Sequence, residues 1–325
     1  MCAKLFMKEP LDKAEYAPKR LRAFVDLVRP FTLLAPIFGG LSGALLGLIA
    51  EGNIHSLEVV STPPFLIWHG FPLFQMLSGI AALVFLNAGS NSLNQVYDCE
   101  IDRINKPYRP IPQGIITEKE GLWIAGLLYV ISIWRAAMVN RTFLLMVCVL
   151  SLITIAYSVP PLRLKKRIWL SNISIAVPRG MLGLVAAWTI TADIGDSAPW
   201  LMGSVMAIFL TGSITTKDIT DIEGDREFGM MTLPVVYGRK KAILLSAPFL
   251  VVPFLLMVLY WYLGLLPGSS IIMAGVFLIW SIYLIILLVR SGDREDQHFE
   301  NSPAWKQMYL MLLGLQVGFL IVYLV

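Results

Sequence analysis

Nine apolar runs recur along this chain, and they constrain its fold more than any other feature. Each is close to the roughly 20 residues that an α-helix needs to cross a bilayer. Only 15% of the residues are charged, well below the quarter or so that is typical of soluble domains. The alternating pattern of a membrane β-barrel is absent from the sequence. We therefore predict an all-α, polytopic transmembrane bundle of nine helices, at about 31–50, 73–96, 121–139, 142–158, 170–190, 199–216, 242–263, 269–289 and 307–325.

Lysines and arginines fall almost entirely on one side of these predicted helices. With the N-terminus placed in the cytoplasm, only Arg135, Arg141 and Arg179 among the 26 basic residues lie outside cytoplasmic segments. Positive residues concentrate on the cytoplasmic side of membrane proteins. We therefore predict a basic cytoplasmic N-terminal arm over residues 1–28, a single transmembrane domain over 29–325, and a C-terminus outside. Three scattered cysteines fit neither a disulfide framework nor a zinc site.

Two rows of acidic side chains follow apolar runs, and both fall on the predicted cytoplasmic side. The first row, in NQVYDCEID at 94–102, repeats every four residues; the second, in KDITDIEGD at 217–225, repeats at three and four. Each spacing places side chains on one face of a helix. The six residues are Asn94, Asp98, Asp102, Asp218, Asp221 and Asp225. Carboxylate oxygens suit Mg²⁺. The alternative, a solvated helix cap, explains a single aspartate better than two aligned rows.

Basic residues accompany both acidic rows. Lys106 and Arg109 follow the first row, Lys217 precedes the second, and Arg163 and Lys165 lie in YSVPPLRLKKR after the fourth predicted helix. Arginine binds phosphate through a bidentate fork, and lysine binds it as a point charge. Carboxylates and cations at one membrane face therefore predict a site for a metal-bridged phosphate. Membrane topology alone also places cations here, and the residues leave that alternative open.

Three motifs, in this order, resemble those of the UbiA superfamily of intramembrane prenyltransferases. They are NQVYDCEID followed by NKPYRPIP, YSVPPLRLK at 157–165, and DITDIEGD at 218–225. The corresponding family patterns are NDxxDxxxD, YSxPPLRLK and DxxDxxGD. Gln95 stands where the first pattern usually has an acid, so we expect one formal ligand charge fewer. The resemblance covers about residues 25–325, and the family's nine helices agree with the nine apolar runs.

The resemblance implies an activity and a set of site residues. The enzyme would transfer a prenyl group, of geranylgeranyl length or longer, from a prenyl diphosphate to a lipophilic acceptor and release pyrophosphate. The expected cofactor is Mg²⁺, bound by Asn94, Asp98, Asp102, Asp218, Asp221 and Asp225. The expected catalytic residues are Asp98, Asp102, Asp218, Asp221 and Tyr157, although Tyr157 could equally be an interfacial anchor. The expected diphosphate ligands are Lys106, Arg109, Arg163, Lys165 and Lys217.

Arg179 lies inside the fifth predicted helix, in the stretch AVPRG. A charged side chain within a membrane helix is costly, which makes it a candidate functional residue. Arg179 could bind an anionic acceptor, pair with a carboxylate, or extend its guanidinium to the interface. The sequence leaves all three open.

The acceptor is also open. The motifs are compatible with a glyceryl phosphate ether lipid or an aromatic quinone precursor, and a chlorophyllide-type acceptor is an alternative. A membrane transporter is the alternative of another class, but it predicts polar residues at the bilayer midplane, whereas the acids here gather at one face. The expected partners are a prenyl diphosphate, a lipophilic acceptor and membrane lipid, with no nucleic acid.

Overall fold

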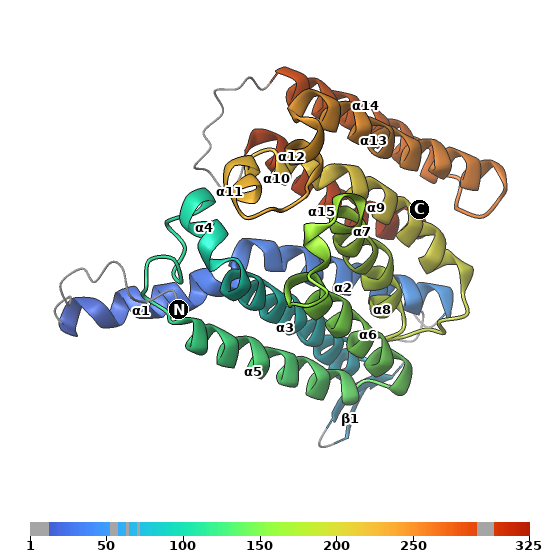
Figure 1. The fold of residues 1–325 in the computed structure, drawn as a ribbon. Coiled ribbons are helices and arrows are strands. Elements are labelled where there is room, and N and C mark those ends of the chain that lie inside the picture. The colour runs from blue at the N-terminus through green and yellow to red at the C-terminus, as the bar shows by residue number, and fades with distance from the viewer. Residues whose placement is uncertain (1–12, 53–57, 63–64, 70–71, 291–301) are drawn as a thin grey trace.

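The computed structural model describes residues 13–52, 58–62, 65–69, 72–290 and 302–325, which form a bundle of long helices (Figure 1). The N-terminal half contains α1 Lys13–Val28, the 3₁₀ helix η2 Pro30–Leu33, α2 Leu34–Ala50, β1 Glu58–Thr62, β2 Phe65–His69, α3 Leu73–Tyr97, α4 Cys99–Asn105, α5 Glu118–Ala137 and α6 Arg141–Ser158. The C-terminal half contains the 3₁₀ helix η4 Leu164–Lys166, α7 Ile168–Ala176, the π-helix η5 Val177–Leu182, α8 Gly183–Trp188, α9 Ser197–Ser213, α10 Thr215–Asp218, α11 Ile222–Glu227, α12 Leu233–Tyr237, α13 Arg239–Tyr262, α14 Ser270–Arg290 and α15 Pro303–Leu324.

Nine helical spans in the described ranges are long and apolar enough to cross a membrane, which confirms the predicted bundle. They run Lys19–Ala50, Leu73–Tyr97, Glu118–Ala137, Arg141–Ser158, Ile168–Trp188, Ser197–Asp218, Arg239–Tyr262, Ser270–Arg290 and Pro303–Leu324. The all-α class is confirmed as well. The structure adds one short antiparallel hairpin, in which β1 pairs with β2 and Glu58 lies opposite His69.

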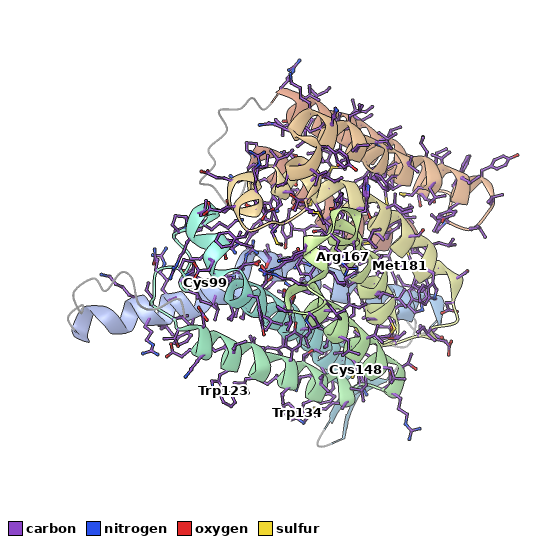
Figure 2. All side chains as sticks on the ribbon, in the orientation of Figure 1. Cys99, Trp123, Trp134, Cys148, Arg167 and Met181 are labelled. Atoms are coloured by element: carbon purple, nitrogen blue, oxygen red, sulfur yellow. The ribbon has the colours of Figure 1, made fainter. Side chains whose placement is uncertain are left out.

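The outer surface of the bundle is apolar. Trp123 and Trp134 of α5 point outward (Figure 2), with 81% and 59% of their surface exposed. Ile272 and Ile279 of α14 are each 71% exposed. A soluble protein rarely exposes large contiguous apolar patches, whereas hydrocarbon tails are a favourable environment for such side chains. The chain is therefore an integral, multi-pass membrane protein.

The first span is bent where α1 meets α2. Arg29 has a left-handed backbone conformation with a φ of 56°, which ends α1, and Pro30 then starts the short helix η2. Helix α1 packs on α3, and Leu27 at its end is fully buried. The observed span Lys19–Ala50 runs across the boundary between arm and domain that we predict at residues 28 and 29. The position of the arm relative to the membrane stays a prediction.

The fifth span changes helix type in its middle. Pro178 has no backbone N–H to donate, and the span passes through η5 between α7 and α8. Gly180 of η5 lies directly against α9, where an added Cβ would be 2.6 Å from the backbone nitrogen of Ala207. Small residues allow such backbone contact between membrane helices. This contact fixes the segment that carries Arg179.

Candidate active site

The first acidic row lies where α3 gives way to α4. Asp98 sits between the two helices with φ −104° and ψ 9°, so the helical path is interrupted but its direction continues. Asp102 is buried within α4, and Asn94 donates from Nδ2 to Ser158 Oγ over 3.4 Å. All three side chains reach one polar pocket.

The second acidic row has a similar local structure. Asp218 ends α10, Asp221 precedes α11 with φ −103° and ψ 6°, and Asp225 lies within α11. All three are buried, with 4%, 6% and 8% of their surface exposed. These side chains line the same polar pocket as the first row. The predicted convergence of the two rows is therefore what the structure shows.

Asn105 joins the two acidic rows directly. Its Nδ2 donates to the backbone oxygen of Asp221, and its Oδ1 accepts from the backbone N–H of Gly224, both over 2.9 Å. An added Cβ at Gly224 would lie 2.8 Å from the Asn105 amide, so only glycine leaves room for it. Helices α4 and α11 consequently lie side by side (Figure 1). The sequence reasoning missed Asn105, although it directly precedes the basic loop and Gly224 belongs to the second motif.

Each predicted diphosphate ligand contacts a carboxylate. Lys106 bonds to Asp221 across the two rows, and Lys165 bonds to Asp98. Three further pairs, measured from nitrogen to oxygen, are Arg109 to Asp102 at 2.6 Å, Arg163 to Asp98 at 3.3 Å and Lys217 to Asp221 at 3.6 Å. Arg163 is the one member of the predicted set that does not line the polar pocket. Arg163 contacts the Asp98 carboxylate from outside the pocket, and its guanidinium also donates to the backbone oxygen of Tyr97.

The charges of the second row are unequal. Burial raises the pKa of Asp221, but the ammonium groups of Lys106 and Lys217 outweigh it and hold the pKa at about 2. Burial raises the pKa of Asp225 to about 8, and the neighbouring carboxylates of Asp221 and Asp218 add to that rise. The second row therefore contains one strongly ionised carboxylate and one that holds a proton near neutral pH.

Similar opposing effects act on the first row and on the lysines. Burial raises the pKa of Asp98, yet Lys165 and Arg163 bring it below its usual value. Burial raises the pKa of Asp102 even though Arg109 opposes the change. Burial also lowers the pKa of Lys106 and Lys165, with Asp221 and Asp98 opposing it respectively.

The donor set of the polar pocket fits Mg²⁺. The pocket has a volume of about 30 Å³, and the side-chain oxygens of the two acidic rows line it. Asp218 Oδ2 is buried there without a hydrogen-bond partner in the described residues. Among those residues, no three or more His, Cys, Asp or Glu side chains are already arranged to hold an ion, and Lys106, Arg109 and Lys165 contact carboxylates of the two rows. Mg²⁺ does not require such a cage, since it takes one or two carboxylates with water and phosphate.

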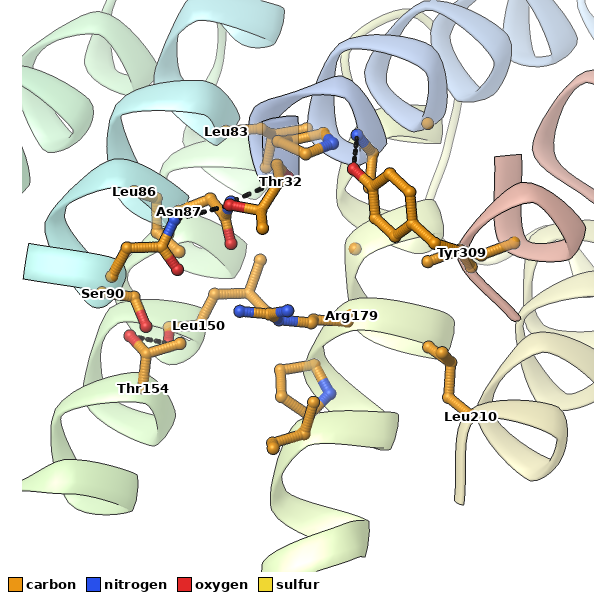
Figure 3. A pocket seen from close by; sticks show the side chains of 18 of the residues that line it. Thr32, Leu83, Leu86, Asn87, Ser90, Leu150, Thr154, Arg179, Leu210 and Tyr309 are labelled. Atoms are coloured by element: carbon orange, nitrogen blue, oxygen red, sulfur yellow. Dashed lines mark hydrogen bonds between the residues drawn. The ribbon is translucent and has the colours of Figure 1, made fainter. Parts of the chain in front are cut away.

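A larger cavity of about 190 Å³ continues from the polar pocket into the bundle. Asn94, Tyr157 and Lys217 line both spaces, so they mark the junction. Figure 3 shows Arg179 pointing into this membrane cavity, between Leu150 and Tyr309. Tyr157 therefore lies at the junction, where the sequence placed a catalytic residue, and Arg179 lies deeper, outside the polar pocket.

Gln95 does not belong to the site. It is fully buried away from the polar pocket, and its Nε2 donates to the backbone oxygen of Leu27 over 2.6 Å. The expectation that Gln95 removes a ligand charge is wrong, because this side chain holds the end of α1 against α3. An acid at this position could not donate that hydrogen bond when ionised.

Comparison with known proteins agrees with this geometry. The model of the UbiA prenyltransferase family matches residues 59–313. The chain belongs to the UbiA prenyltransferase family. Like its family, it is an enzyme that transfers a prenyl group, and the transporter alternative is wrong.

Two UbiA relatives extend over most of the chain. The digeranylgeranylglyceryl phosphate synthase of Thermococcus kodakarensis is 30% identical over 92% of this chain and 99% of its own. The homogentisate phytyltransferase of Synechocystis is 28% identical over 89% of this chain and 90% of its own.

Solved UbiA structures share the fold. A homologue from Archaeoglobus fulgidus, bound to GPP and Mg²⁺, has a TM-score of 0.67 at 18% identity and covers 92% of this chain and all of its own. A structure described as a digeranylgeranylglyceryl phosphate synthase in membranes has a TM-score of 0.66 at 22% identity, covering 94% of this chain and 99% of its own.

Proposed function

We propose that this enzyme uses Mg²⁺ to transfer the prenyl group of a prenyl diphosphate, of geranylgeranyl length or longer, to an acceptor in the membrane cavity. The observation that carries the proposal is the direct joining of the two acidic rows through Asn105. That joining forms one pocket in which a buried carboxylate oxygen of Asp218 lacks a partner. A UbiA homologue of the same fold was solved with GPP and Mg²⁺, which supports the ligand classes.

The roles divide along the pocket walls. The metal ligands in this proposal are Asn94, Asp98, Asp102, Asp218, Asp221 and Asp225. Lys106, Arg109, Lys165 and Lys217 neutralise the diphosphate, and Arg163 positions Asp98 for them. Tyr157, at the junction, faces the place where the reacting carbon would lie.

The reaction is a substitution at the allylic carbon of the donor. The bond from that carbon to the diphosphate oxygen breaks, and its electron pair leaves with pyrophosphate. A new bond forms to a nucleophilic atom of the acceptor, which loses a proton to solvent. Mg²⁺ held by the two acidic rows would supply Lewis-acid stabilisation of the leaving group. The lysines and Arg109 stabilise the charge that develops there, while the apolar walls of the membrane cavity keep water from the carbocation.

The acceptor proposal follows the relatives. They include an ether lipid synthase and a homogentisate phytyltransferase. We therefore propose a glyceryl phosphate ether lipid or an aromatic quinone precursor. Membrane lipid is the surrounding partner, and the donor is an amphiphile with an apolar prenyl chain and a charged diphosphate.

The test is a product assay on purified enzyme in lipid nanodiscs. Labelled geranylgeranyl diphosphate is offered with a panel of both acceptor classes, and products are identified by mass spectrometry. Asp98→Ala and Asp221→Ala should each lower kcat by about 100-fold or more, because each removes a proposed ligand of the metal that would stabilise the charge developing on the leaving diphosphate. Chelation of Mg²⁺ by EDTA should stop the wild-type reaction.

Matched controls lie on the same segments. Glu100 and Glu223 are exposed acids outside the polar pocket, so Glu100→Ala and Glu223→Ala should retain activity. Near-normal turnover by Asp98→Ala or Asp221→Ala, with folding intact, would contradict the assignment.

A further inference from the structure

Arg179 differs from the cations of the polar pocket. Lys106, Arg109 and Lys165 each contact a carboxylate. Arg179 has no ion pair and no hydrogen bond from its side chain in the described residues, and the ionisable groups that act on it are the hydroxyls of Tyr157 and Tyr309. Its side chain is exposed, and it opens into the membrane cavity. The cation is therefore available to a ligand.

Arg179 lies deep in the membrane, where a guanidinium without a partner is unusual. It lies eleven residues beyond Ile168, where its span begins, which corresponds to about 16 Å along a helix in a hydrocarbon core about 30 Å thick. A guanidinium there is too far inside for its charge to reach the interface easily. Tyr309 cannot supply a counter-charge, because its hydroxyl already donates to the Phe31 carbonyl over 2.9 Å and accepts from the Ala35 N–H over 3.0 Å.

A second unpartnered polar group lines the same cavity. Gln316 of α15 is only 5% exposed, and its Oε1 is buried without a hydrogen-bond partner in the described residues. Gly39 makes room for this amide, since an added Cβ there would lie 2.5 Å from Gln316 Nε2. Buried polar atoms are normally hydrogen-bonded. The remaining wall is largely apolar, including Leu150 and Leu312, and Arg29 also lines it.

The donor diphosphate does not explain Arg179. The polar pocket has its own cations, and Arg179 is not among the residues that line it. Asn94, Tyr157 and Lys217 separate the two spaces. An anion beside Arg179 therefore belongs to a second molecule.

We infer that Arg179 binds an oxyanion, a phosphate or carboxylate, on the acceptor, and that the enzyme selects anionic amphiphiles over neutral ones. This inference rests on the proposed function, since it assigns the second substrate of the same reaction. Arginine forms bidentate bonds to either oxyanion. The hydrocarbon part of the acceptor lies against the leucine wall, and Gln316 supplies a neutral polar contact.

Binding without turnover tests this inference. The polar pocket is first filled with saturating Mg²⁺ and a non-ionising thiolo analogue of geranylgeranyl diphosphate. Hexadecyl phosphate and hexadecanol are then titrated against the protein in nanodiscs. The wild-type enzyme should prefer the phosphate by about 10- to 100-fold, the range expected for hydrogen bonds to a charged group. Arg179→Met should remove that preference, and Arg179→Lys should keep part of it.

Arg135→Met is the matched control. Arg135 also lies within a span, but it packs beside Phe74 and Trp134 and lines neither the polar pocket nor the membrane cavity. This variant should keep the phosphate preference.

Arg179→Met should also raise the melting temperature of the ligand-free protein, because it removes an unpaired charge from the membrane interior. A lowered melting temperature would indicate a structural role and overturn the inference.

Assays of prenyl transfer show whether the acceptor carries a phosphate or a carboxylate. They also separate failure of the Arg179 inference from failure of the proposed function. Arg179→Met should raise KM for a glyceryl phosphate ether lipid or for an aromatic carboxylate, whichever the wild type accepts, and leave donor affinity within about twofold. A phosphate preference that survives in Arg179→Met, or is absent from the wild type, overturns the inference. Failure of the wild type to release pyrophosphate from geranylgeranyl diphosphate with Mg²⁺ instead overturns the proposed function.

Discussion

At the scale of residues, the sequence revealed the charged groups but not the contacts that organise them. The spacing of Asp98, Asp102 and Asp221 was enough to predict one site, because charge rows beside lipid need a counter-ion. Asn105 carries no charge, so a search for acidic residues did not select it, although its place three residues after Asp102 continues the same helix face. Its role follows from a partner 119 residues away, Gly224, and a single sequence does not show such pairs. The same holds for Gln95, whose buried bond to Leu27 is visible only in the fold.

Replacing Asn105 should therefore loosen the site without removing a ligand. Asn105→Ala leaves the Asp221 carbonyl and the Gly224 N–H unpaired, which should cost about 1–3 kcal/mol of stability. We also expect a higher Mg²⁺ concentration at half-maximal activity, because the two acidic rows lose their common spacing. Thermal unfolding and a Mg²⁺ titration of the transfer rate measure the two effects.

Asn140 provides the comparison for this prediction. Its side chain also donates to a backbone oxygen, that of Thr189, and accepts from a backbone N–H, that of Phe143. Asn140→Ala should lower stability but leave the Mg²⁺ dependence unchanged. Equal shifts of the Mg²⁺ dependence in both variants would mean that Asn105 has no special connection with the site.

At the scale of elements, the sequence was enough to predict the membrane helices, but not the places where they bend or change helix type. Runs of apolar residues predicted eight of the nine spans to within about four residues of their observed ends, whereas the first observed span begins at Lys19, well before the predicted start at residue 31. The bend at Arg29 and the π-helix η5 depend on local hydrogen bonding and on tertiary packing. Pro178 indicated a disturbance in the fifth span, but not its form. The irregular element carries Arg179, so the least predictable part of this span is the part that reaches the cavity.

Close packing at η5 leads to an element-scale prediction. Gly180→Ala places a methyl group within 2.6 Å of the Ala207 nitrogen, so η5 and α9 must separate. We expect a loss of about 1–3 kcal/mol, the usual cost of overpacking, measured by thermal unfolding in nanodiscs. Gly126→Ala, on α5 with nothing within 4 Å of the added Cβ, is the control and should cause no loss. Unchanged stability in Gly180→Ala would show that the two elements can move apart freely.

At the scale of the whole molecule, the arrangement relative to the membrane follows from charge placement. Coordinates give the bundle and its apolar surface, whereas orientation depends on which end of each helix retains lysine and arginine. The basic N-terminal arm and both acidic rows lie on the side that we propose to be cytoplasmic, and residues 29–325 form the proposed catalytic domain. The C-terminus at Val325 then lies outside.

Reporter fusions test this orientation. Alkaline phosphatase, which is active outside the cytoplasm, should be active when fused after Val325. A green fluorescent protein fused at the N-terminus should fluoresce. Moving the same phosphatase to the loop after Ser158, which joins the fourth and fifth spans, should silence it. Phosphatase activity at that loop together with none at Val325 would reverse the orientation and place the site on the other side.

The pairing of every pocket cation with a carboxylate also affects how the site fills. Four basic side chains line the pocket, Lys106, Arg109, Lys165 and Lys217, together with five aspartates, of which Asp225 holds a proton near neutral pH, so the ligand-free pocket is close to electroneutral. A lone divalent cation or a lone diphosphate would leave excess charge in a buried space, which is costly. The charges of the two together largely cancel. The pocket would thus suit a metal–diphosphate salt that enters as one unit, and its lysines would then exchange an aspartate partner for a phosphate oxygen.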